Sequence, residues 1–257
     1  MVSTYSMRSL TKGSDKLPAM SGIADLMQKA TKSQFVAGLW VDNLIDDLRW
    51  TVEPNTIWDD QDPETTGFVT HRASSEYRAP TFSWASINMG VISYELTHRS
   101  KLDPVAVILD AKCDLKGANP LGEVTNGFLT LEAYLVRAEL STATGKWTKA
   151  IGIYELRREG MKADMRADFP IVEIVGLLED GSQIDALGRA TGEDKIDPID
   201  GSVICLALGC SGKDIVALVL SHSRKVPGAY ERLGNMVYDG IDWFDKGKVR
   251  KSVITIV

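Results

Sequence analysis

The three histidines are the side chains of this chain best suited to acid–base chemistry, because an ordinary imidazole changes its charge between about pH 5 and 8. His71 lies in a polar segment, His98 lies at the end of a predicted strand, and His222 lies at the end of the predicted strand 215–221. Loops and strand ends are where binding and catalytic residues gather. We therefore predict all three as candidate acid–base or hydrogen-bonding residues, with a surface or capping role as the alternative for each.

Four further side chains are predicted to contact a substrate: Trp58, Arg78, Trp84 and Tyr94. Trp58 lies in a polar segment without periodic apolar neighbours, so a ligand-facing or lid position is a reasonable interpretation. Arg78 and Trp84 are close enough in sequence for the guanidinium to stack on the indole. The alternative is that Arg78 and Trp84 hold the junction between a helical and a strand-rich region.

No metal or cofactor is predicted. No two histidines have metal-ligand spacing, and the cysteines at 113, 205 and 210 form no C-x-x-C pair. Aspartates 59, 60 and 62 lack the glycine and the distal glutamate of an EF-hand loop. Phosphate-loop, dinucleotide-binding, zinc-protease and nucleophile-elbow motifs are missing, and the glycines of 208–213 are typical of a hairpin turn.

Composition limits the partners that we expect. The 257 residues carry a net charge of −6, with a pI near 5.2, so phosphate backbones are not attracted and no nucleic acid is predicted. No apolar run approaches the roughly 20 residues of a membrane span, and the N-terminus has no apolar signal region. Three unpaired cysteines fit a reducing compartment. We therefore expect a cytoplasmic protein without a membrane partner.

The pattern of apolar residues predicts an α+β fold in one domain, 1–257. Residues 1–52 form a helical part, with helices near 24–32 and 39–50; residues 53–76 form a long polar loop. Residues 77–257 are β-rich, and the run 216–220 is expected to be buried on both faces. We expect the short N-terminal helices to pack on a mainly antiparallel sandwich or barrel. The predicted strands are 83–94, 105–112, 125–138, 149–156, 169–178, 202–208, 215–221, 230–238 and 252–257.

Several segments, taken in order, carry a resemblance to a known family. The most specific is 77–86, Tyr-Arg-Ala-Pro-Thr-Phe-Ser-Trp-Ala-Ser. With 5–11, 15–24, 36–40, 119–124, 127–129, 204–208, 216–220 and 228–234, it resembles the C-terminal region of fungal heterokaryon-incompatibility (HET) domain proteins. Phe82 stands where the family usually has Trp. The chain has no counterpart of the N-terminal HET domain, and we expect a natural stand-alone protein.

The resemblance leaves two classes of function open. The first is a cofactor-independent enzyme of fungal secondary metabolism, which folds an apolar intermediate into a reactive shape for a cyclisation, an isomerisation or a pericyclic step of the Diels–Alder type. The second is a recognition module of the incompatibility system, which the family resemblance supports directly and which predicts an exposed apolar patch for a protein partner. A degenerate fragment is a third alternative, disfavoured because strands and turns are mutually consistent.

Overall fold

A computed structural model of the 257-residue chain defines the fold. It describes residues 2–6, 10, 12–53, 71–72, 77–88, 91–94, 101–142, 153–169, 171, 174–177, 183–185, 190–191, 202–223, 225–245 and 249–257. Trp58 and His98 lie outside these described residues.

Short helices and small pairings make up the N-terminal part. The longest helix, α2, ends where Lys32 adopts a left-handed backbone (φ 62°) and donates its N–H to the Gln28 carbonyl, a common way to terminate a helix. The elements are α1 (Val2–Ser6), η1 (Gly13–Lys16), η2 (Pro18–Met20), α2 (Ser21–Thr31), β1 (Phe35–Val36), β2 (Leu39–Trp40), η3 (Val41–Asn43), α3 (Leu44–Asp47), β3 (Thr51–Glu53), β4 (His71–Arg72), η4 (Trp84–Ser86), β5 (Ile87–Asn88) and β6 (Val91–Ser93).

The predicted helix over 39–50 is shorter than expected. A hairpin takes its first residues, because Ala37 and Gly38 both have positive φ (46° and 95°) and form a two-residue turn between β1 and β2. Helical structure runs only from Val41 to Asp47. Trp40 therefore lies in a strand opposite Phe35 rather than on a helical stripe.

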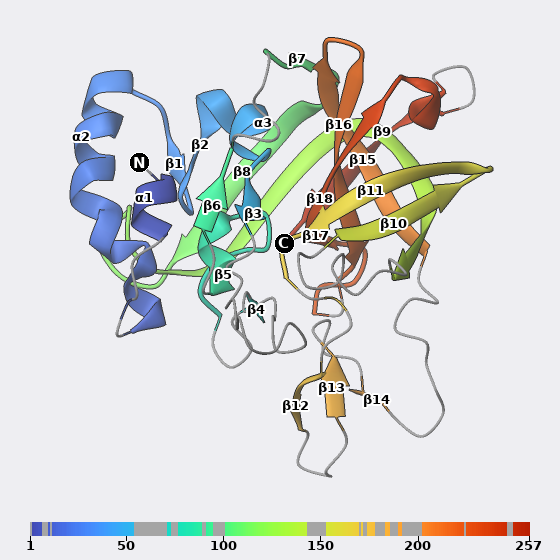
Figure 1. The fold of residues 1–257 in the computed structure, drawn as a ribbon. Helices are drawn as coiled ribbons and strands as arrows, with labels where there is room; N and C mark the ends of the chain where they lie inside the picture. Colours follow the sequence, from blue (N-terminus) through green and yellow to red (C-terminus); the bar gives the residue numbers. More distant parts are fainter. Residues whose placement is uncertain are drawn as a thin grey trace, which may run out of the picture.

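Strands dominate the rest of the chain (Figure 1). They are β7 (Asp103–Pro104), β8 (Val107–Leu115), β9 (Val124–Thr142), β10 (Ile153–Arg158), β11 (Met161–Ala167), β12 (Ile174–Leu177), β13 (Gln183–Asp185), β14 (Ala190–Thr191), β15 (Ser202–Ser211), β16 (Asp214–His222), β17 (Tyr230–Asp239) and β18 (Lys251–Ile256), with η5 (Asp242–Phe244) before β18. Strands β12–β14 form a separate three-stranded sheet.

Six of the strands close into a barrel. Antiparallel pairings run from β9 to β10, β11, β17, β16 and β15, and β15 returns to β9. The 19-residue strand β9 makes this possible, because its C-terminal half pairs with β10 and β15 while its N-terminal half pairs with β8 and β18. The ring confirms the expected mainly antiparallel architecture and selects the barrel of the two alternatives.

Gly234 allows the ring to close between β11 and β17. A Cβ atom at this position would overlap the Arg166 carbonyl oxygen and lie 2.9 Å from the Ala167 Cα. Glycine is therefore required where the two backbones approach, and the Asp168 N–H donates to the Leu233 carbonyl just beyond this point.

The interior of the barrel is apolar, as the sequence predicted for β16. Every residue from Ile215 to Leu220 is buried, so both faces of this strand are covered. The β15–β16 connection is the expected hairpin, with Ser211 opposite Asp214 and a positive φ at Gly212. One continuous core cluster joins barrel residues to residues of the N-terminal part, such as Leu44 and Trp50.

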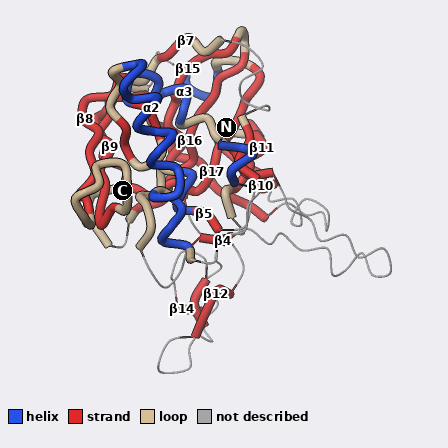
Figure 2. Tube along the Cα trace, turned by 90° about the vertical axis from the view of Figure 1, so that its left-hand side faces the viewer, coloured by secondary structure: helices blue, strands red, loops and turns tan. Residues whose placement is uncertain are grey.

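The N-terminal part lies on one side of the barrel. Figure 1 shows α1 and α2 at the far end from β10 and β11, and Figure 2, turned by 90°, shows α2 in front of the strands with β8 at the outer edge. Among the described residues, we find no helix with the length and apolar character needed to cross a bilayer.

A fully buried ion pair joins the two parts. Arg232 of β17 and Asp168 are 0% and 1% exposed, and Nε of Arg232 lies 2.7 Å from Oδ2 of Asp168. The same guanidinium donates from Nη1 to the Leu48 carbonyl (2.7 Å) and from Nη2 to the Trp50 carbonyl (2.5 Å). It also lies over the Trp50 ring, with Cζ 3.5 Å from the centroid. Strand β17 is thereby attached to the end of α3.

Removing one partner of this pair should destabilise the protein strongly. Asp168→Asn leaves the Arg232 charge buried without its counterion, so we expect a loss of about 3–5 kcal/mol in the free energy of unfolding, measured in urea. Asp239→Asn is the matched control, because its ion pair with Lys213 is exposed and should contribute under about 1 kcal/mol. Equal losses in the two variants would show that the buried pair does not hold the parts together.

Candidate functional site

An apolar cavity of about 300 Å³ lies within the N-terminal part. We call it the N-terminal pocket. Such a volume is at the lower end of the range of small-molecule sites, about 300–1,000 Å³. Its described lining comes from α1, η2, α2, the β1–β2 hairpin, the end of α3 and the residue after β6: Val2, Ser3, Met20, Ile23, Ala24, Met27, Phe35, Gly38, Trp40, Asp47 and Tyr94.

The pocket exists because the apolar stripe of α2 is not packed into the core. The spacing of Ile23, Leu26 and Met27 predicts an amphipathic helix, and the helix is present. However, Ala24 is the only fully buried residue of α2, while Ile23 and Leu26 are 46% and 67% exposed. The helix thus presents Ile23 and Met27 to the pocket and leaves Leu26 exposed to solvent.

Asp47 is the only charged residue among the described residues that line the pocket. Its Oδ2 accepts the Trp40 backbone N–H at 2.8 Å, and its Oδ1 accepts the Asn43 side-chain amide, also at 2.8 Å. Burial raises the pKa of the Asp47 carboxyl; these two hydrogen bonds oppose the rise, and the nearby Asp46 charge adds to it. A half-buried carboxyl group of this kind is suited to exchange a proton with a ligand.

Tyr94 shares the pocket with Asp47, and it is one of the predicted substrate-binding residues. Burial is the main reason why the pKa of its phenol is raised, and the Asp47 charge raises it further, whereas Arg232 acts in the opposite direction. The phenol therefore stays protonated and lies within electrostatic reach of both Asp47 and the buried Arg232. Tyr94 thus links the pocket, which it lines, to Arg232 at the junction between the N-terminal part and the barrel.

Trp84 lies beside the pocket rather than in its lining. Its side chain is 1% exposed, and its indole N–H donates to the Gly38 carbonyl at 2.9 Å. A Cβ at Gly38 would lie 2.7 Å from the indole nitrogen, so the turn needs glycine both for its φ of 95° and for this approach. Ser83 adds a second bond to the turn, donating to the Ala37 carbonyl at 2.5 Å. These contacts fix the hairpin that carries Phe35 and Trp40.

Arg78 lies against the start of the chain and not on the Trp84 face. A Cβ at Gly13 would overlap its guanidinium. Lys16, rather than Arg78, lies over the Trp84 ring, with Nζ 5.5 Å from the centroid, and donates to the Ile87 carbonyl at 2.5 Å. Burial and the Arg78 charge lower the pKa of Lys16 to about 8. Because this amine is buried and bonded, it is a structural group here and not an accessible nucleophile.

Of the predicted histidines, His222 has a described side chain, and it does not line the pocket. His222 ends β16, is exposed, and its ring lies 4.8 Å from the Tyr230 ring on the barrel. The backbone of His71 pairs with Asn88 in the β4–β5 ladder. His98 and Trp58 are not among the described residues, so their predicted roles stay predictions. Of the predicted site residues that the structure describes, Tyr94 is the one in the pocket lining.

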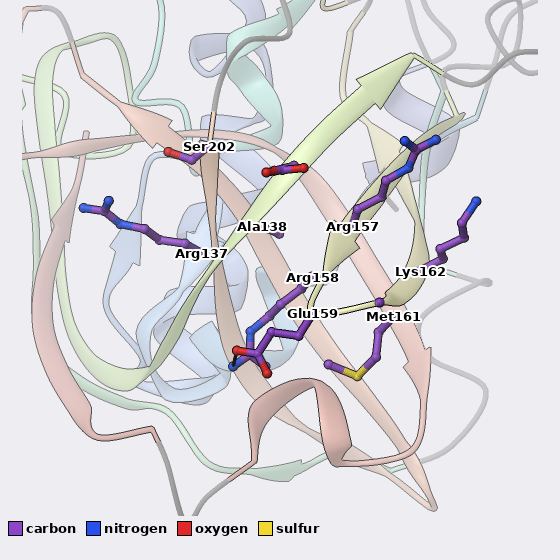
Figure 3. Close-up of a pocket in the computed structure, with 10 residues that line it drawn as sticks. Arg137, Ala138, Arg157, Arg158, Glu159, Met161, Lys162 and Ser202 are labelled. Atoms are coloured by element: carbon purple, nitrogen blue, oxygen red, sulfur yellow. Dashed lines mark hydrogen bonds and ion pairs between the residues drawn. The ribbon is translucent and has the colours of Figure 1, made fainter.

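A second, more open cavity of about 500 Å³ lies at the edge of the barrel between β9, β10, β11 and β15. Its lining is charged, but the charges do not converge: in Figure 3, Arg157 and Lys162 point to one side and Arg137 to the other. Glu155 is paired with both Arg157 (2.5 Å) and Lys162 (3.0 Å). Arg158 is bonded to the Trp243 carbonyl and paired with Glu159. Three of the four cations in the described lining, Arg157, Arg158 and Lys162, are thus already paired with a carboxylate, and the N-terminal pocket is the better candidate site.

The described residues contain no group of three or more His, Cys, Asp or Glu that could hold a metal ion. Cys113, Cys205 and Cys210 are all free thiols. Burial raises the pKa of Cys113 and of Cys205 to about 12 in each case, so neither is an activated thiolate.

Comparisons with known proteins identify no relative: no protein-family model, no curated protein and no solved structure matches the chain.

The carboxyl of Asp47 should titrate above its ordinary pKa of 3.8. The titration is followed through the ¹³C chemical shift of the Asp47 carboxyl carbon, and the resonance is assigned by its loss in Asp47→Asn. Because the folded pKa is raised, the folded state binds the proton more tightly than the unfolded state, and this stabilising contribution is lost as the pH rises from about 3.8 through the folded value. Wild type should therefore lose stability relative to Asp47→Asn over that window. A midpoint at or below 3.8 would contradict the argument.

Proposed function

We propose that this protein is a cofactor-independent enzyme that rearranges an apolar small molecule in the N-terminal pocket, by isomerisation or cyclisation, with Asp47 exchanging the proton. The observation that carries the proposal is a single carboxyl group of raised pKa in an otherwise apolar, aromatic-lined cavity. Clefts of this composition are the usual form of small-molecule sites.

The proposed reaction requires that the ligand is held in a reactive shape and that one proton is exchanged with Asp47. Holding a flexible apolar molecule in a reactive shape lowers a barrier by up to about 7–11 kcal/mol when the geometry is favourable. The Asp47 carboxylate takes a proton from one position of the ligand, and the carboxyl group so formed gives a proton back at another position. The net reaction is then redox-neutral and leaves the enzyme unchanged. Tyr94, protonated and near Asp47, is placed to orient a polar group of the ligand.

The resemblance to the C-terminal region of fungal HET-domain proteins supports a fungal context for this proposal. Three of the segments that carry it contact one another: Ser83 and Trp84 bond to the 37–38 turn, and the Arg232 N–H donates to Thr81 Oγ1 at 2.9 Å. These contacts give the segments a structural reason to occur together. The proposal assigns the reaction to the pocket beside them, as a step of secondary metabolism.

A recognition module is the second candidate function. The exposed Ile23 and Leu26 of α2 are the apolar surface that this alternative expects, and Ile23 also lines the pocket. In that case the surface of α2, rather than the pocket interior, would carry the function.

Metabolite profiling of the source organism tests the proposal. Deleting the gene should remove one product and accumulate its uncyclised or isomeric precursor. Restoring the wild-type gene should recover the product, whereas Asp47→Asn should lower its rate of formation by about 10²–10⁴-fold, the usual contribution of a positioned acid–base group.

Asp42→Asn is the matched control, since it removes the same charge from an exposed residue of the adjacent turn. It should restore the product fully. Full restoration by Asp47→Asn would show that Asp47 is not the proton-exchanging group. An unchanged profile combined with altered hyphal fusion compatibility, restored by wild type but not by Leu26→Asp, would instead favour the recognition module.

A further inference from the structure

The described lining of the N-terminal pocket carries negative charge only, from Asp47. Among the described lining residues, Asp47 is charged and no lysine or arginine faces it across the cavity. Each carboxylate oxygen accepts one protein hydrogen bond, from the Trp40 N–H and from the Asn43 amide, and keeps capacity for another. A ligand that complements this lining therefore has an apolar body and a positively charged group.

The aromatic residues of the pocket strengthen the same preference. The Phe35 and Trp40 rings meet edge to face, with centroids 5.1 Å apart and an interplanar angle of 62°. Both side chains are only half-buried, so their surfaces are available to the cavity. The face of an aromatic ring attracts a cation, and tryptophan does so best. Met20 and Met27 complete the wall with polarisable thioethers.

We propose that the N-terminal pocket selects an organic cation, with Asp47 as its counterion and with Trp40 and Phe35 as the aromatic surfaces that contact the charged group. This rests on the proposed function and specifies its ligand class: the molecule bound is an ammonium compound with an apolar body. No such preference is expected at the barrel edge, where arginine and lysine line the cavity.

The test compares choline with its uncharged carbon isostere, 3,3-dimethylbutan-1-ol, by NMR titration of backbone amides. Wild type should bind choline at least about 10-fold more tightly, with shifts at Gly38, Trp40 and Tyr94. Asp47→Asn should reduce that preference to below about 3-fold without changing the affinity for the alcohol. Asp42→Asn should behave as wild type.

A second variant keeps the proposal falsifiable if Asp47→Asn fails to fold. Trp40→Leu keeps an apolar wall but removes the aromatic face, so it should lower the preference for choline over the alcohol about 5-fold. Equal affinities of wild type for the two probes, or no binding of choline, would overturn the cation preference. Neither result would overturn the proposed enzyme, because that depends on loss of product in the Asp47→Asn strain.

Discussion

The buried guanidinium of Arg232 is the constraint on which the arrangement of this molecule depends. One planar group pairs with Asp168 beyond β11, accepts the Trp50 ring against its face, and donates to two carbonyls at the end of α3. The Trp50 carbonyl also accepts the Asn235 side-chain amide, whereas Arg232 is the donor to the Leu48 carbonyl, and a buried carbonyl left without a donor costs about 1–3 kcal/mol. The barrel and the N-terminal part are thereby fixed by hydrogen bonds of defined direction, whereas apolar contact alone would permit them to slide.

Several segments that stand out in the sequence meet around this arginine. Thr81 Oγ1 accepts the Arg232 N–H, the Trp50 indole donates to the Phe82 carbonyl at 2.9 Å, and the Thr81 N–H donates to the Val257 carbonyl at 3.0 Å. The distinctive 77–86 block is thus explained in large part by the junction that it builds. Through Trp84, the block also positions the hairpin that forms one wall of the N-terminal pocket.

The strands could be predicted more fully than the helices, for reasons that particular residues illustrate. Continuous burial of 215–220 follows from an unbroken apolar run, and it was found. The strand Met161–Ala167 was missed although its apolar and charged residues alternate with period two, because its inward residues include two small alanines and its outward ones are ionic. The helix over 39–50 was predicted too long, since periodicity does not register the positive φ of Ala37 and Gly38 that turns the chain into a hairpin.

The candidate site was largely beyond sequence reasoning, because it is assembled by tertiary contacts. Tyr94 is one of the predicted substrate-binding residues, whereas Asp47 falls within the predicted helix near 39–50 and is not among the predicted site residues. In the folded chain Asp47 accepts the backbone N–H of Trp40, seven residues earlier, across the helical segment formed by η3 and α3. No local pattern encodes that bond. The exposure of the apolar stripe of α2 could not be predicted from the sequence either, because an amphipathic pattern predicts that its apolar side chains are buried. The Asp47–Trp40 hydrogen bond and the exposed stripe of α2 both belong to the wall of the N-terminal pocket. Deviations from simple packing rules that gather at one place in this way are characteristic of a functional site.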